Sequence, residues 1–253
     1  MLATVSIFFI CSGIVIALVI ANDLAHHKQS MKIMNVVWVL TALWASYLAL
    51  WAYFKFGRET MKMDDSAGDM QMKSDMQSMP EMKMDMDMKD MPMDMSMGDM
   101  GDMGRPHWQS VALSALHCGA GCTLADIIGE WFTSYYPISI GGSLLVGSWV
   151  FDFILALIIG VYFQFYAIRE MEKISVSSGL SRAFKADFFS LTSWQVGMYG
   201  WMAIVYFVIF KDVPLVKDSW TFWFMMQLAM LIGFVCAYPM NALLIKLGVK
   251  KGM

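Results

Sequence analysis

LATVSIFFICSGIVIALVIA, residues 2–21, is an uncharged apolar run of the length that a helix needs to cross the hydrocarbon core of a bilayer. Further uncharged runs occupy residues 33–54, 108–125, 188–210 and 219–245, and a sixth, residues 131–168, is interrupted only by Asp152. Apolar residues make up 58% of the chain and charged residues 15%, a composition outside the range of soluble domains. The sequence therefore predicts an all-α integral membrane bundle of six transmembrane helices.

A methionine-rich segment separates the second run from the third. Residues 61–103 contain sixteen methionines, eleven acidic residues and four basic residues, so this segment has a charge of −7 within a chain of net charge −3. Its other residues are mainly Asp, Lys, Ser, Gly and Pro, which cannot build a core. We expect three parts: a transmembrane hairpin at residues 1–56, a disordered loop at 57–106 and a four-helix membrane domain at 107–253.

The methionine spacing indicates a soft-metal site. A thioether is a neutral, polarizable donor that selects Cu(I) or Ag(I) over hard cations and binds without losing a proton. The predicted ligands follow a Met-x-Met pattern: Met82, Met84, Met86, Met88, Met91, Met93, Met95 and Met97. The alternatives are a plain spacer or an oxidant sink in which Met becomes its sulfoxide, but a spacer would normally use Gly, Ser, Pro or Glu.

The third run carries a second candidate site. Cys118, Cys122, Asp126 and Glu130 are each four residues apart and therefore share one helix face. His117 lies about 100° from Cys118 on the same helix. We expect His117, Cys118 and Cys122 to act as metal ligands, with the packing of small residues at a helix interface as the alternative. Thiol–disulfide chemistry is disfavoured, since Cβ atoms of such neighbours are about 5–6 Å apart.

Asp152 and two methionines complete the predicted transit path. An ionisable residue near the middle of an apolar run is costly and marks function, so we expect Asp152, like Asp126, to balance the charge of a passing cation or to relay a proton. Its depth suggests a site shared with His117 and Cys118. Met198 and Met202 resemble the Met-x-x-x-Met signature of the eukaryotic high-affinity copper transporters, although packing is the more common role of such a pair.

Membrane sidedness depends on the helix count. With six crossings, the positive-inside rule places the amino terminus and residues 61–103 in the cytoplasm. The segment 108–125, rich in Gly, Ser and Ala, also fits a re-entrant helix, and five crossings of that kind would place the loop outside. We expect the first run to be a helix rather than a signal peptide, because no Lys or Arg precedes it and it lacks a small-residue cleavage pattern before Asn22 and Asp23.

Residues 107–250 resemble a bacterial membrane family known as domain-of-unknown-function family 4396. The resemblance rests on the His117–Cys122 helix, on the Asp152-bearing helix and on the aromatic run WQVGMYGW at residues 194–201. It implies a multi-helix membrane fold and carries no mechanism. The methionine-rich segment lies outside this unit as an insert.

Together these patterns predict a Cu(I) or Ag(I) transport or copper-tolerance protein of the bacterial inner membrane. The alternatives are a membrane thiol or redox enzyme using Cys118 and Cys122, and a metal-sequestering scaffold that delivers copper without transporting it. Expected partners are the lipid bilayer, the copper ion, a copper chaperone, oxidase or efflux protein, and further copies of the chain, but no nucleic acid. No Walker loop is present, so a gradient or a partner would drive movement.

Overall fold

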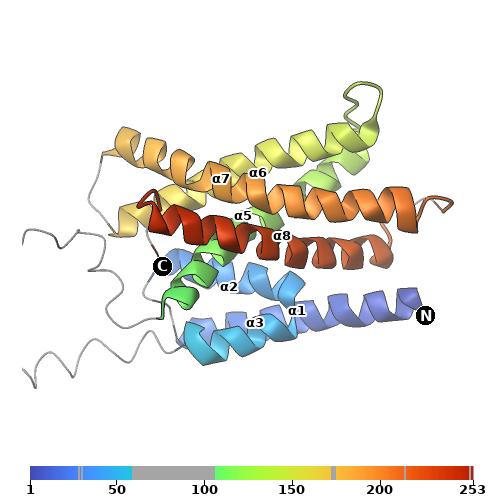
Figure 1. Ribbon diagram of the computed structural model, residues 1–253. Helices are drawn as coiled ribbons and strands as arrows, with labels where there is room; N and C mark the ends of the chain where they lie inside the picture. Colours follow the sequence, from blue (N-terminus) through green and yellow to red (C-terminus); the bar gives the residue numbers. More distant parts are fainter. Residues whose placement is uncertain are drawn as a thin grey trace, which may run out of the picture.

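The computed structural model describes residues 1–27, 29, 31–58, 106–171, 175–213, 215–250 and 252. Its named elements in these ranges are all helical (Figure 1). They are α1 (Leu2–His26), α2 (Lys32–Ala45), α3 (Tyr47–Ala52) with a π-helical turn at Tyr53–Gly57, α5 (His107–Tyr135), α6 (Leu144–Met171), α7 (Val176–Ile204) with a π-helical turn at Val205–Ile209, and α8 (Trp220–Lys246). The methionine-rich segment lies outside the described residues.

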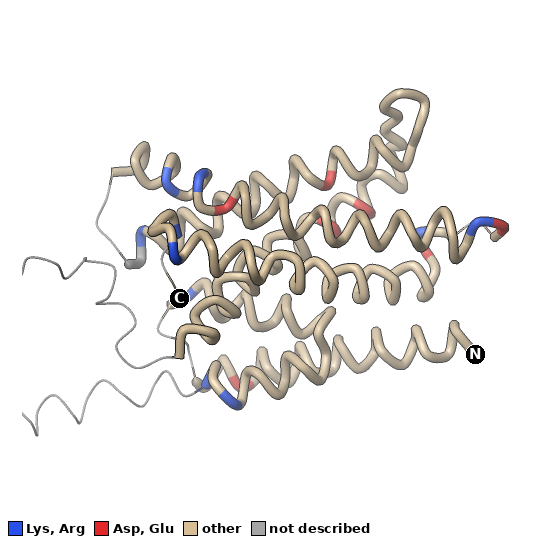
Figure 2. Tube along the Cα trace, viewed as in Figure 1, with Lys and Arg blue, Asp and Glu red and all other residues tan. Residues whose placement is uncertain are grey.

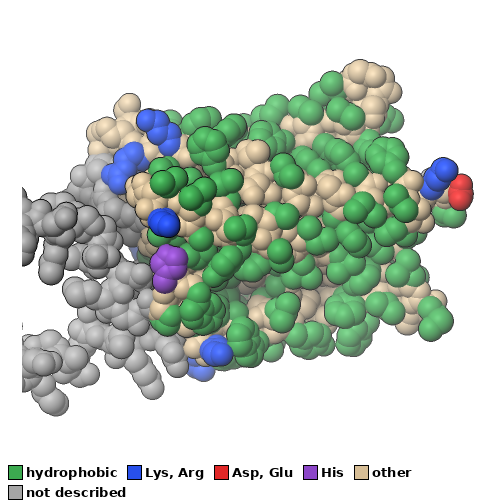
Figure 3. Space-filling model, in the orientation of Figure 1, with side chains coloured by type: hydrophobic (Ala, Val, Ile, Leu, Met, Phe, Trp, Pro, Cys, Tyr) green, Lys and Arg blue, Asp and Glu red, His purple; other side chains and the backbone are tan. Residues whose placement is uncertain are grey.

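Four of these helices, α1, α5, α6 and α8, are long and apolar enough to span a membrane, which confirms the predicted membrane-helical class for the described part of the chain. Apolar side chains cover the middle of the face seen in Figure 3, whereas Lys and Arg lie toward its two ends. Because lipid tails solvate apolar surface, exposed residues such as Leu18, Ile158 and Val235 are expected on a membrane-facing surface.

Helix α5 is the central element of the bundle. Its most apolar 18-residue window is 83% buried, compared with 28–33% in the other three candidate spans. It packs against α2, α6, α7 and α8. The helix continues without a break for 29 residues and is long and apolar enough to span a membrane, and the alternative of a re-entrant segment at residues 108–125 stays a prediction.

The second apolar run, residues 33–54, folds back on itself. Ser46 lies between α2 and α3, as the C-cap of the first and the N-cap of the second. Its φ of 44° and ψ of −115° reverse the chain. The far end of the run returns to α1: Tyr53 Oη donates to Asp23 Oδ2 at 2.6 Å, and Arg58 forms an ion pair with Asp23 at 3.2 Å. Since α2 also starts just after α1, both ends of this re-entrant hairpin lie at one end of the bundle (Figure 1). The second arm of the transmembrane hairpin predicted at residues 1–56 is thus two short helices, α2 and α3, in place of one continuous helix.

The turn residue at the tip of the re-entrant hairpin, Ser46, is only 5% exposed, as backbone at membrane depth must be buried in protein. Gly13 of α1 has no side chain, which lets the turn approach; a Cβ there would lie 2.7 Å from the carbonyl oxygen of Leu43. The reversal at Ser46 leaves the last carbonyls of α2 without helical partners. Gln227 of α8 donates from Nε2 to one of them, that of Leu43, at 2.6 Å.

Positive charge gathers at the end of the bundle that carries the base of the hairpin (Figure 2). The start of α5 also lies there, because Phe56 and Trp108 have ring centroids 5.7 Å apart. The end of α8 joins them through Tyr238 Oη, which donates to the carbonyl of Trp108 at 3.4 Å. The cations at this cation-rich end are Lys32, Lys55, Arg58, Arg169, Arg182, Lys185, Lys246 and Lys250.

The hairpin can be tested by cysteine labelling in a Cys11→Ser background. His26→Cys and Lys55→Cys flank the base of the re-entrant hairpin, and both positions are exposed. We expect a membrane-impermeant maleimide to label both from the same side and Ser139→Cys, in the α5–α6 connection, from the opposite side. Labelling of Lys55→Cys together with Ser139→Cys would mean that residues 33–54 cross.

Packing at the hairpin tip can be tested by Gly13→Ala. The added methyl group would meet the backbone of Leu43, which cannot move without distorting the turn, so we expect a loss of about 1–3 kcal/mol in unfolding free energy. Gly200→Ala is the matched control, since nothing lies within 4 Å of a Cβ there; it should be neutral or stabilising by about 0.5–1 kcal/mol. Equal stability of the two variants in denaturant titrations would contradict the close approach.

Candidate functional site

One face of α5 carries a line of buried ionisable side chains: Cys118, Cys122, Asp126 and Glu130, called the α5 stripe below. All four are at most 5% exposed. As the four-residue spacing predicts, they occupy a single continuous helix. The α5 stripe therefore extends through about three turns at the centre of the bundle.

Glycines make room for carboxylates next to the α5 stripe. A Cβ on Gly129 would overlap the carboxylate of Asp152 from α6, and a Cβ on Gly160 would overlap that of Asp187 from α7. A Cβ on Gly121 would lie 3.1 Å from the Cα of Gly160, so the backbones of α5 and α6 meet closely there. Small residues at these crossings thus admit two more acidic side chains into the core.

The middle of this region combines thiols and unpaired carboxylates. Cys118 and Cys122 are neighbouring free thiols, and Cys118 lies beside the carboxylate of Asp187. Among the described residues, neither oxygen of Asp126 or of Asp187 has a hydrogen-bond partner. Buried carboxylates without partners are costly, which makes this region a candidate functional site.

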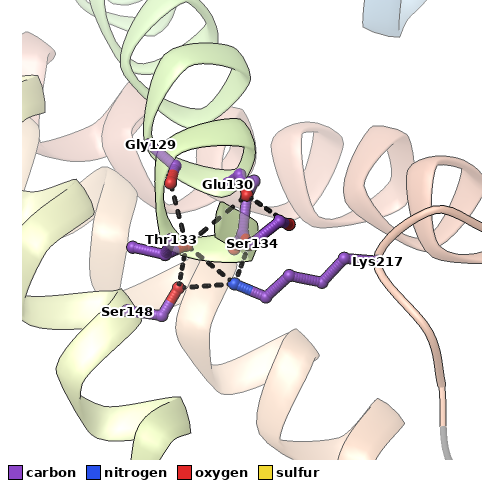
Figure 4. Close-up of polar contacts among 6 residues, drawn as sticks. All are labelled: Gly129, Glu130, Thr133, Ser134, Ser148 and Lys217. Atoms are coloured by element: carbon purple, nitrogen blue, oxygen red, sulfur yellow. Dashed lines mark hydrogen bonds and ion pairs between the residues drawn. The ribbon is translucent and has the colours of Figure 1, made fainter. Parts of the chain in front are cut away.

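At one end, the α5 stripe meets Lys217, which comes from the segment between α7 and α8. Its ammonium forms an ion pair with Glu130. It also donates to Thr133 Oγ1 and to Ser148 Oγ, each at 2.9 Å (Figure 4). Asp152 lies beside Glu130, so two acidic side chains and two hydroxyls gather around a single lysine.

At the other end, the cation-rich end, the residues after α8 place a second lysine in the core. Lys250 is 3% exposed. Its ammonium donates to the carbonyl of Ser114 at 3.3 Å and to Asn241 Oδ1 at 2.9 Å, and it faces Asp187 and His117. The buried acidic residues Asp126, Glu130, Asp152 and Asp187 thus outnumber the two lysines that approach them.

His117 and Asp152 do not lie together at one site, contrary to what the sequence had predicted. His117 is buried but turned toward α6, where its ring centroid is 6.2 Å from that of Phe163. Asp152 lies against Gly129, which is about 18 Å along the axis of α5 from His117 at 1.5 Å per residue. The expected site shared by Asp152, His117 and Cys118 is therefore wrong. The described residues contain no group of three or more His, Cys, Asp or Glu side chains arranged to hold a metal ion.

The predicted methionines divide into two sets. Met198 and Met202 are 1% and 2% exposed and belong to the apolar core of α7, which is the packing role considered above. Met82, Met84, Met86, Met88, Met91, Met93, Met95 and Met97 lie outside the described residues, and their assignment as metal ligands stays a prediction.

Asp187, Lys217 and Lys250 belong to this region, and sequence reasoning missed their roles. Each lies at or beyond the edge of an apolar run, where a charged residue is usually taken as a membrane-boundary residue. Asp187 directly precedes the run 188–210, but its side chain is 0% exposed. Only the packing of α7 against Gly160 places it inside the bundle.

Comparison with known proteins gives a family and no activity. Residues 107–250, more than half of the chain, match the model of a family described as a domain of unknown function, DUF4396. Neither a curated protein nor a solved structure matches. The matched range contains the α5 stripe, Asp152, Asp187, Lys217 and Lys250. The predicted resemblance is confirmed: the chain belongs to the DUF4396 family of domains of unknown function.

Proposed function

We propose that this protein moves a soft monovalent cation, Cu(I) or Ag(I), across the bacterial inner membrane and so contributes to copper tolerance. The observation that carries the proposal is the α5 stripe, in which two buried thiols continue into two buried carboxylates along the central helix. Thiols are the softest ligands that a protein offers. The excess of carboxyl groups over lysines favours a cation rather than an anion as the moving species.

The proposed topology has five crossings, by α1, α5, α6, α7 and α8. Helix α7 and its π-helical turn together have the length of a span, with the apolar run 188–210 in their second half. The positive-inside rule then places the cation-rich end in the cytoplasm and the amino terminus outside. This arrangement also removes a difficulty of six crossings, in which Lys28 and Lys32 would follow the first helix on the outer side.

We infer from this topology that the methionine-rich segment is on the cytoplasmic side, because the elements that flank it, the π-helical turn at Tyr53–Gly57 and α5, meet at the cation-rich end, where Phe56 contacts Trp108. Thioethers there would collect Cu(I) from the cytoplasm. Transfer to Cys118 and Cys122 would follow, with Asp187 and Asp126 balancing the charge of the cation. We therefore infer export, with exit near Glu130.

A thiol–disulfide enzyme is less compatible with the geometry. Exchange requires a thiolate to reach an external disulfide, and both Cys118 and Cys122 are 0% exposed. A delivery scaffold would need only a metal-binding site and would not need buried polar side chains along the central helix, such as those of the α5 stripe. It remains the outcome if the protein binds copper but shows no flux.

The transport proposal can be tested in proteoliposomes under reducing conditions with radioactive silver as the probe. We expect Cys118→Ser to lower the initial rate about tenfold or more, since changes around bound metal cost at least this much, and Asp126→Asn to lower it as well. Cys236→Ser is the matched control: this thiol lies on α8 beside Gly197, away from the α5 stripe. Its rate should equal that of the unmodified protein.

Two results would contradict the proposal. Normal flux in both Cys118→Ser and Cys122→Ser would remove the α5 stripe from the path. Saturable silver binding with no flux in the unmodified protein would support the delivery scaffold instead.

A further inference from the structure

The ammonium of Lys217 lies in a cage made only of oxygen atoms. Glu130 supplies a carboxylate from α5, Thr133 Oγ1 lies one turn further along the same helix, and Ser148 Oγ comes from α6 (Figure 4). Thr133 Oγ1 also donates to the carbonyl of Gly129 at 2.8 Å. That bond occupies the hydroxyl hydrogen and leaves the oxygen lone pairs directed at the cation.

The cage is buried, whereas its occupant is attached to a connecting segment. Glu130, Thr133 and Ser148 are 5%, 6% and 3% exposed. Lys217 is more open, with 27% of its side chain exposed, and belongs to the residues between α7 and α8 rather than to either helix. A cavity of about 170 Å³ adjoins the cage, lined by Trp131, Tyr135 and Trp223 as well as by the ion pair. Lys217 therefore has space to leave.

Glu130 is the acidic side chain that Lys217 neutralises, and it has other buried acidic neighbours. Asp152 is 2% exposed and lies beside Glu130, and its Oδ1 has no hydrogen-bond partner among the described residues. Asp126 lies one turn away on the α5 stripe. If Lys217 left with nothing replacing it, Glu130 would remain as a buried carboxylate without its counter-charge, which is strongly unfavourable.

We propose that the Lys217 cage is a binding site for a hard monovalent cation of ammonium size, K⁺ or NH₄⁺, and that Lys217 is its tethered resting occupant. Oxygen ligands suit hard cations and do not select Cu(I), so this site is separate from the thiols of the α5 stripe. The N···O distances of 2.9 Å to both hydroxyls match those of an ammonium ion, whose radius is close to that of K⁺. Exchange of Lys217 for a free cation would supply the coupling ion that an export mechanism without ATP requires.

Cation-dependent stability of the purified full-length protein tests the site independently of copper flux. We expect K⁺ or NH₄⁺ to raise the unfolding temperature of Lys217→Met saturably, by about 2 °C or more, relative to N-methylglucamine chloride at equal ionic strength. A Na⁺ series tests size selection, and comparison of the K⁺ and NH₄⁺ series identifies the preferred ion. Adding Glu130→Gln to Lys217→Met should abolish the rise. Lys211→Met, an exposed lysine of the same connecting segment, is the matched control and should show no rise.

The unmodified protein provides a second test in case the variants do not fold. If K⁺ displaces Lys217, the rate at which an acetylating reagent modifies Lys217, followed by mass spectrometry, should increase at least twofold in K⁺ but not in N-methylglucamine, and Lys211 should not change. Identical behaviour of Lys217→Met in all salts, or an acetylation rate of Lys217 independent of K⁺, would overturn the proposal. Loss of silver flux with the cation effects intact would overturn only the transport function.

Discussion

The structure depends on keeping buried acidic side chains in a helical bundle where water does not compensate their charge. Charging such groups is costly at membrane depth unless cations, protons or hydrogen-bond donors offset them. Four carboxyl groups lie on or beside α5: Asp126, Glu130, Asp152 and Asp187. The glycines at the crossings of α5, α6 and α7 leave room for these side chains, because a methyl group at Gly129 or Gly160 would occupy the space of a carboxylate.

Two lysines offset part of this charge, and both come from outside the helices. Lys217 belongs to the connection before α8, and Lys250 belongs to the residues after it. They approach opposite ends of the buried acidic region, so an ammonium group of the chain itself lies at each end of that region. Segments that connect helices move more readily than packed helices do, so in the proposed transport function these two contacts are where the bundle would open.

The sequence was informative wherever a local period decided the outcome. Apolar run length predicted the membrane helices, and the four-residue spacing predicted the face shared by Cys118 and Glu130. It failed at Ser46, since nothing in the run 33–54 distinguishes one crossing helix from two half-helices. The reversal depends on Gly13 and on Gln227, which are distant in sequence. Asp187, Lys217 and Lys250 were missed for the same reason, because side chains from separate segments meet only after folding.

In the proposed function the helical bundle itself binds Cu(I), and not only the methionine-rich segment. The most direct measurement is an anaerobic Cu(I) titration of the purified protein lacking residues 61–103, with Cys118→Ser in the same background as its control. We expect that the shortened protein still binds one Cu(I) per chain and that Cys118→Ser abolishes this binding. Loss of all Cu(I) binding on removal of residues 61–103 would contradict it.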